Sequence, residues 1–268
     1  MFFSIKMRSK ERRQIMKTTK KNAKILINKS IGIFLVILIW AVASSIGDLS
    51  ESLLPSPWSV LRKMIELFAD GTMGNHVLVS MTRVIKGFFI ALAIAIPVGL
   101  IIGTVKPVQR ALDPLIELFR PIPPTAMISL SILWFGIGEA SKIFIIAWAS
   151  FFPILLNVVG GVQQVERIHI LAAKTLGANF FDIFVDVILR SAVPSIVIGM
   201  RSGFSMAFIS LVAAELIAST SGIGYFIQDA RYMYRIVDVF VGIIVIGFIG
   251  FVLNQVLLKL EKSLITWK

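Results

Sequence analysis

GFFIALAIAIPVGLIIGTV, residues 87–105, is a continuous apolar run without a charged side chain. A helix needs about 20 such residues to cross the hydrocarbon core of a bilayer. Lipid offers the backbone no hydrogen-bond partner, so we expect this segment to be helical. Four further charge-free runs have similar length: Ser30–Gly47, Pro121–Gly138, Ile143–Val165 and Val239–Leu258. Together they predict an all-α integral membrane protein.

A sixth membrane span is expected over residues 192–218, although this stretch contains Arg201 and Glu215. Charged groups inside a membrane are costly and usually face protein or water. In one interpretation both lie near the helix ends and reach the interfaces; in the other they belong to a solute path. The composition agrees with about six spans, because 57% of the 268 residues are hydrophobic and 16% are charged. A soluble domain is far less apolar.

The basic residues predict the orientation of the chain. Ten of the 27 Lys and Arg residues precede Ser30, which places the N-terminus in the cytoplasm, and six spans return the C-terminus to the same side. The net charge of +12 is therefore expected to orient the chain and attract anionic lipid rather than nucleic acid. We expect a multi-pass protein of the bacterial inner membrane. Its expected divisions are a basic arm (1–29), a first span (30–47), an extracytoplasmic segment with an amphipathic helix (48–75), a core of about five spans (76–260) and a cytoplasmic tail (261–268).

Local signals mark helix boundaries outside the spans. Ser56 followed by Pro57 is typical of a helix start, and the Asp70-Gly71 turn is typical of its end. The helix between them would lie along the membrane surface. Three prolines in RPIPP, residues 120–124, remove backbone donors and favour extended conformations. The third span is therefore expected to begin after a break that follows an inside loop, residues 106–120.

The segment LAAKTLGANFFDIFVDVILRSAVP, residues 171–194, follows the expected span Ile143–Val165 and leads into the span expected over residues 192–218. Its apolar residues follow helical spacing on both sides of Gly177, which predicts two short helices joined by a turn. Gly177 suits the left-handed position that ends a helix, and Asn179 can cap the next helix with Asp182. The adjacent Ala172 and Ala173 leave one face nearly flat. That face is typical of a docking element, and the alternative is a helix pair that only covers the bundle.

The sequence holds no recognisable catalytic or metal-binding cluster. Cysteine is absent, and the two histidines, His76 and His169, are expected on opposite sides of the membrane. No Gly-Lys dipeptide occurs, so a phosphate-binding loop is missing and ATP hydrolysis is expected in a separate subunit. We expect neither an enzyme nor a cofactor. An ion-coupled transporter centred on Glu215 is the alternative, because Glu139 and Asp238 fall at span ends.

The 163–190 loop resembles the cytoplasmic "EAA" loop of bacterial ABC importer permeases. The alanine pair, the glycine and the apolar end of the second helix match that pattern, whereas Leu171 replaces the usual acidic residue and Arg190 the usual proline. Residues 120–157 and 211–227 resemble permeases for nitrate, taurine, aliphatic sulfonates and thiamine-precursor pyrimidines. This likeness covers about residues 54–260. The resemblance assigns ATPase coupling to Leu171, Ala172, Ala173, Gly177, Ala178, Val187 and Leu189.

The same resemblance implies a fold of the type I ABC importer permease and a heteromeric complex. Two permease copies would form the channel, two ATPase subunits would bind the loop, and an external binding protein would deliver a small solute. Closure of the ATPases would rotate the bundle between inward-facing and outward-facing states. Arg201 would be a countercharge for an anionic solute, with Glu215 as a second residue of the path.

Overall fold

The computed structural model describes residue 32 and residues 34–45 and 53–264, and every regular element in these ranges is helical. The expected basic arm and the end of the tail lie outside the described residues. The chain divides into two compact units, Met1–Lys63 and Met64–Lys268. The first unit contains an apolar helix, Phe34–Ser45, which is the described part of the expected first span. Trp40 Nε1 donates a hydrogen bond of 3.1 Å to the carbonyl of Pro55.

Helix α2 (Pro57–Ala69) confirms both predicted boundaries. The hydroxyl of Ser56 accepts a hydrogen bond of 3.1 Å from the backbone N–H of Ser59, as expected of an N-cap. Gly71 then adopts a left-handed conformation with φ of 79° and separates α2 from the next helix.

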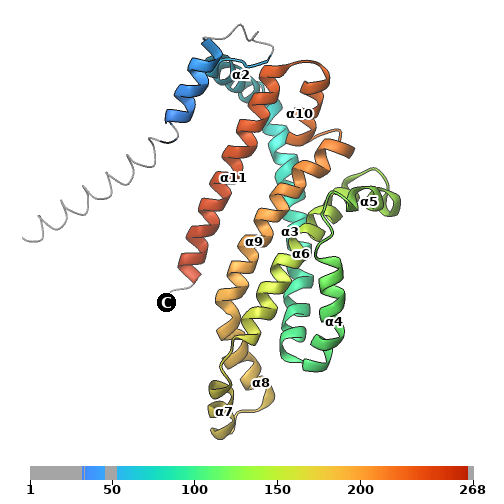
Figure 1. The fold of residues 1–268 in the computed structure, drawn as a ribbon, viewed down its shortest axis with the longest axis vertical. Coiled ribbons are helices and arrows are strands. Elements are labelled where there is room, and N and C mark those ends of the chain that lie inside the picture. Colours follow the sequence, from blue (N-terminus) through green and yellow to red (C-terminus); the bar gives the residue numbers. More distant parts are fainter. Residues whose placement is uncertain (1–31, 33, 46–52, 265–268) are drawn as a thin grey trace, which may run out of the picture. The chain divides into compact units, whose positions relative to one another are not determined.

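The second unit is a bundle of long and short helices (Figure 1). In chain order they are α3 (Thr72–Thr104), α4 (Lys106–Phe119), α5 (Met127–Phe135), α6 (Glu139–Gln163), α7 (Arg167–Thr175), α8 (Phe180–Asp182), a π-helical segment (Ile183–Leu189), α9 (Arg190–Ala218), α10 (Ile223–Tyr232) and α11 (Ile236–Leu264). Four continuous helical stretches of the described residues are long and apolar enough to cross a membrane: Thr72–Thr104, Glu139–Gln163, Phe180–Ile217 and Ile236–Ser263.

Close backbone approaches fix the directions of these helices. Three glycines of α3 lie against α6 so tightly that a Cβ on each would be 2.6 to 2.8 Å from a side-chain carbon. The pairs are Gly87 with Ile146, Gly99 with Val158 and Gly103 with Val162. The residue numbers of α3 and of α6 increase together along these three pairs, so the two helices run parallel. Helix α9 runs antiparallel to α6, through the pairs Gly161 with Ser195, Gly199 with Asn157 and Gly203 with Ile154.

The parallel arrangement of α3 and α6 requires the chain between them to return across the bundle. Helices α4 and α5 provide this return, and the RPIPP segment separates them. The expected single span Pro121–Gly138 is therefore corrected, because α5 has only nine residues and is about 14 Å long. The expected loop 106–120 is also corrected, because it forms α4, whose Val108, Leu112 and Ile116 pack against the central core.

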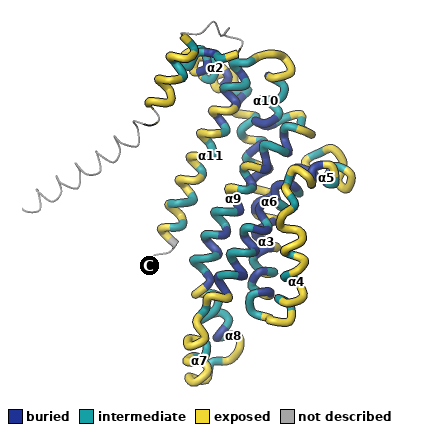
Figure 2. The backbone as a smooth tube through the Cα atoms, viewed as in Figure 1, coloured by how far each residue is buried: buried dark blue, intermediate teal, exposed yellow. Residues whose placement is uncertain are grey.

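The central core lies between α3, α6 and α9. Its fully buried members include Val84, Ile146, Ile154, Val158, Ala207 and Leu211. Figure 2 shows burial concentrated along these three helices, whereas α4 and α7 have no fully buried residue. Helix α11 runs antiparallel to α9, since Gly250 packs on Phe208 and Glu261 pairs with Arg201. The bundle thus has two functional ends, one at the α6–α9 connection and one at the α9–α10 connection.

Candidate functional site

The α6–α9 connection contains the predicted pair of helices. Helix α7 ends in a Schellman motif, in which Gly177 N–H donates to the Lys174 carbonyl and Ala178 N–H donates to the Ala173 carbonyl, each at 3.0 Å. Gly177 has φ of 85°, as its sequence position predicted. This geometry explains the spacing of Ala173 and Gly177, because the glycine ends the helix that carries the alanine.

The second helix of the connection begins with the predicted cap. Asn179 Oδ1 accepts from the Asp182 N–H, and Asp182 Oδ2 accepts from the Asn179 N–H, both at 3.0 Å. The helix is not short, however. Helix α8 passes into the π-helical segment and then directly into α9, so that one helical rod runs from Phe180 to Ile217. The sequence predicted a short helix distinct from the span expected over residues 192–218, and this prediction is wrong.

The two helices present an apolar surface at the end of the bundle. Leu176 is 88% exposed and Phe180 is 78% exposed. We call this surface the apolar end; its large residues are Ile168, Leu171, Leu176, Phe180 and Phe181. The other predicted coupling residues lie beside it or behind it: Ala172 and Gly177 are exposed, whereas Ala173, Ala178, Val187 and Leu189 are half-buried. Large exposed apolar patches mark interaction surfaces.

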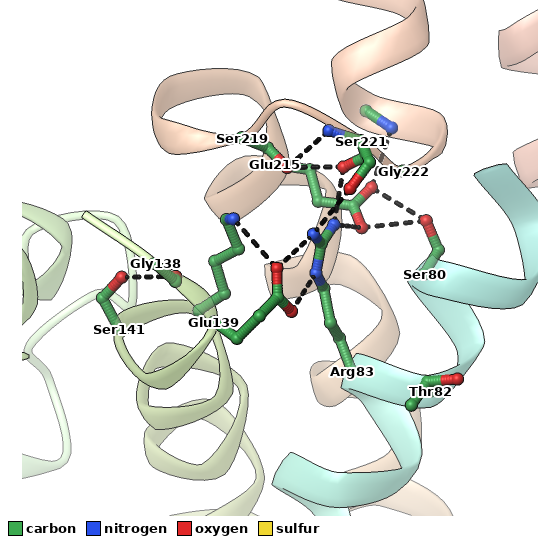
Figure 3. A network of polar contacts seen from close by, with 12 residues as sticks. Ser80, Thr82, Arg83, Gly138, Glu139, Ser141, Glu215, Ser219, Ser221 and Gly222 are labelled. Carbon is green, nitrogen blue, oxygen red and sulfur yellow. Dashed lines mark hydrogen bonds and ion pairs between the residues drawn. The ribbon is translucent and has the colours of Figure 1, made fainter.

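The opposite end contains a charge network centred on the buried Arg83 of α3 (Figure 3). Its Nε and Nη2 atoms donate to the two carboxylate oxygens of Glu139, at 2.7 and 2.6 Å. Its Nη1 atom donates to Glu215 at 2.7 Å and to the Ser221 carbonyl at 2.6 Å. Arg83 is only 2% exposed. One guanidinium therefore joins α3, the start of α6, the end of α9 and the loop that follows α9.

The carboxylate of Glu215 is enclosed by the loop that follows α9. Ser80 donates to both of its oxygens, at 2.8 and 2.9 Å, and Gly224 N–H donates to Oε2 at 2.9 Å. Gly222 has φ of 109°, and a Cβ at that position would overlap the Glu215 carboxylate. Only a glycine fits this position, because the conformation and the carboxylate both exclude a side chain.

The structure places the two predicted path residues in different ion pairs. Arg201 contacts Glu261 of α11 at 2.7 Å and is about one-third exposed, whereas Glu215 belongs to the buried network. Sequence reasoning missed Arg83 as the partner of Glu215, although both are charges in otherwise apolar stretches. It also missed Lys142, which is buried and lies 3.3 Å from Glu139.

The polar groups at this end can hold helices together, and no reacting centre is evident among them. Within residues 53–264 and the described first helix, no group of three or more His, Asp or Glu side chains could hold a metal ion. His76 instead accepts a hydrogen bond of 3.1 Å from the Gly222 N–H through Nδ1. The apolar end offers a contact surface. The opposite end, which we call the charged end after Arg83, Glu139 and Glu215, holds several helices together at a fixed junction.

Known proteins are similar to this chain in sequence. The family model described as "Binding-protein-dependent transport system inner membrane component" matches residues 95–265. The taurine transport system permease of Escherichia coli is 39% identical over 90% of both chains. A putative aliphatic sulfonates permease of Bacillus subtilis is 34% identical, covering 87% of this chain and 84% of its own. The nitrate import permease of Synechocystis is 30% identical over 90% of both chains.

Solved structures agree with the fold. An inward-facing methionine ABC transporter superposes with a TM-score of 0.53 and 19% identity, covering 76% of this chain and 98% of its own. An amino acid ABC transporter superposes with a TM-score of 0.54 and 21% identity, covering 76% of this chain and 94% of its own.

Proposed function

The chain belongs to the family of binding-protein-dependent transport system inner membrane components, as a permease of the ABC importer type, and from this premise we propose its partners and its solute. An ATPase subunit docks on the apolar end. An external binding protein delivers a small oxyanion, a sulfonate or nitrate, to the other end. The termini lie in the cytoplasm, and two copies of the chain form the path in the bacterial inner membrane.

The apolar end supports the docking proposal. Its exposed leucines and phenylalanines are carried by two helix ends that are fixed by hydrogen bonds, namely the Schellman motif at Gly177 and the capping box at Asn179. A rigid apolar surface loses little conformational entropy on binding. The rod from Phe180 to Ile217 then connects that surface with Glu215 near its other end. Movement of the docked subunit would therefore reach the charge network without passing through a loop.

The solute class is supported by the relatives. The three relatives described above are named for taurine, aliphatic sulfonates and nitrate, which all carry oxyanion groups.

Docking is tested by photo-crosslinking in the native membrane. A crosslinker at Ala173, beside the apolar end, is expected to capture a protein that contains a phosphate-binding loop. The matched control is a crosslinker at Ile243 of α11, which is 55% exposed and lies in a membrane span. Capture of the ATPase at Ile243 but not at Ala173 would contradict the docking proposal.

Coupling is tested in vesicles that hold the whole complex. ATP-dependent uptake of labelled taurine or nitrate is expected to survive collapse of the proton gradient while ATP is held constant. Gly177→Arg is expected to leave ATP hydrolysis running but to stop uptake, because the bulky side chain obstructs docking and strains a left-handed position. Uptake that follows the proton gradient and ignores ATP would instead support an ion-coupled transporter.

A further inference from the structure

A cleft of about 420 Å³ opens between the α4–α5 break, α6 and α9. The lining residues used below are Arg120, Pro124, Trp148, Phe152, Asn157 and Met206. A cleft of this volume is in the range of small-molecule sites. It exists because the proline-rich break interrupts the helix that would otherwise pack along α6.

The cleft lies near the middle of the bundle. Helix α6 extends from Glu139 to Gln163, and its lining residues, from Trp148 to Asn157, occupy the central part of this length. Met206 is likewise near the middle of α9. Broken helices in transporters surround solute sites at this depth, because an interrupted backbone is tolerated there only beside protein or a water-filled cavity.

The polar groups of the cleft suit an anion. Arg120 is the one charged residue that lines it, and no ion pair of Arg120 occurs within the described part of the chain. Trp148 lines the cleft with its ring, whereas its Nε1 atom is buried. Arg201 differs, because Glu261 already neutralises it.

The walls of the cleft suit the apolar part of a small organic anion. Phe152 packs edge-to-face on Trp148 with 5.2 Å between ring centroids. Asn157 is anchored by a hydrogen bond of 2.8 Å from its Nδ2 to the Pro153 carbonyl. A guanidinium beside an aromatic wall resembles the few placed polar groups on an apolar surface that define ligand sites.

We propose that this cleft is a transit site for the oxyanion group of the solute, with Arg120 as its countercharge. This inference rests on the proposed function and deepens it. It moves the countercharge from Arg201, the residue that the sequence suggested, to an arginine that has no protein partner in the described residues.

The natural absence of cysteine permits a direct test of the cleft's charge. Met206→Cys introduces a single thiol into the lining of the cleft in the full chain. Its rates of modification are measured with a sulfonate-bearing methanethiosulfonate and with a trimethylammonium reagent of similar size. Arg120→Gln should lower the anion-to-cation rate ratio about fivefold, as expected for a unit charge about 8 Å away in a water-like medium, and Arg120→Lys should retain it.

The comparator is Ser205→Cys, which lines a separate cleft one helical turn from Arg201. Its rate ratio is expected to be unaffected by Arg120→Gln. If the ratio at Met206→Cys does not change in the Arg120→Gln variant, the proposed countercharge is wrong. An equally large change at both thiols would show a general loss of structure and would also reject the assignment.

Uptake measurements provide a second test of the proposal. In vesicles with the complete complex, Arg120→Gln removes the countercharge and is expected to lower taurine uptake at an unchanged level of assembled complex, whereas Arg120→Lys should retain uptake. Unchanged uptake in Arg120→Gln would overturn the transit site while the importer assignment stands. Absence of ATP-driven uptake in the wild-type complex would instead refute the proposed function, and the thiol-reactivity ratio would still report on the cleft.

Discussion

The two ends of the bundle are built in opposite ways. At the apolar end, the hydrogen bonds of the Gly177 and Asn179 motifs are local, and large apolar side chains face outward. At the charged end, Arg83, Glu139 and Glu215 come from distant parts of the sequence and are joined by short hydrogen bonds. The hydrogen bonds of the first end thus join residues that are close in sequence, whereas the other end uses its polar groups to hold distant helices together.

The largest loss of stability is expected when the charge network loses Arg83, its central cation. Arg83→Met leaves the buried Glu215 carboxylate without its cation, and removal of one partner of a buried ion pair costs about 3–5 kcal/mol. The free energy of unfolding in detergent is expected to fall by that amount. The double variant Arg83→Met with Glu215→Met should recover much of the loss. A single variant as stable as the wild type would show that the network does not hold the helices.

A smaller loss of stability at the same end is expected from substitution of Gly222, in the loop that follows α9. Gly222→Ala must place a Cβ against the Glu215 carboxylate in a backbone conformation that disfavours a side chain, and such strain costs about 1–3 kcal/mol. Thermal denaturation should show the loss. The matched control is Gly74→Ala in α3, where a Cβ meets nothing within 4 Å, and its stability should be equal or higher.

At the apolar end, loss of a cap should have a local effect. Asn179→Ala removes the capping box of α8, which is expected to cost about 1 kcal/mol. Hydrogen exchange should accelerate at the amides of residues 180–183 and remain unchanged near Arg83. Exchange that accelerates at both ends would show that the two ends are not energetically separate, contrary to the comparison.

The Arg201–Glu261 pair provides an intermediate case between the two ends. Its partly exposed ion pair should contribute about 0–1 kcal/mol, so Arg201→Ala should barely change the unfolding midpoint. Uptake separates the two candidate countercharges. We expect Arg201→Ala to lower uptake less than Arg120→Gln does, and the reverse order would restore Arg201 as the countercharge of the path.

The smallest effect on stability is expected from the apolar end's exposed surface. Phe180→Ser removes a side chain that is 78% exposed, so the free energy of unfolding should change by less than about 0.5 kcal/mol. Copurification of the ATPase should nevertheless weaken. A stable variant that still binds the ATPase normally would place the docking surface elsewhere.

Local features could be predicted from the sequence, whereas long-range pairings could not. The left-handed Gly177, the Asn179 cap and the Ser56 cap depend on residues within a few positions, and all three are confirmed. The partnership of Arg83 with Glu215 joins residues 132 positions apart, and a single sequence does not display such a contact. The roles of the predicted coupling residues remain predictions.

The return of the chain between α3 and α6 is a second feature that the sequence did not predict correctly. The run Pro121–Gly138 was expected to hold one span after a proline break, but its helix α5 has only nine residues, and the amphipathic α4 completes the return. Periodicity within α4 agrees with a helix, but its charges suggested a loop. Only the parallel packing of α3 against α6 shows that this segment must cross.

The seven π-helical residues in the rod, Ile183–Leu189, have a geometric consequence for transmission. A helix advances about 100° and 1.5 Å for each residue, so every residue that such a segment gains or releases turns the rest of the rod by nearly a third of a revolution. The segment lies between the apolar end and α9. A change in its winding would therefore rotate α9 and the side chains that it presents to its neighbours.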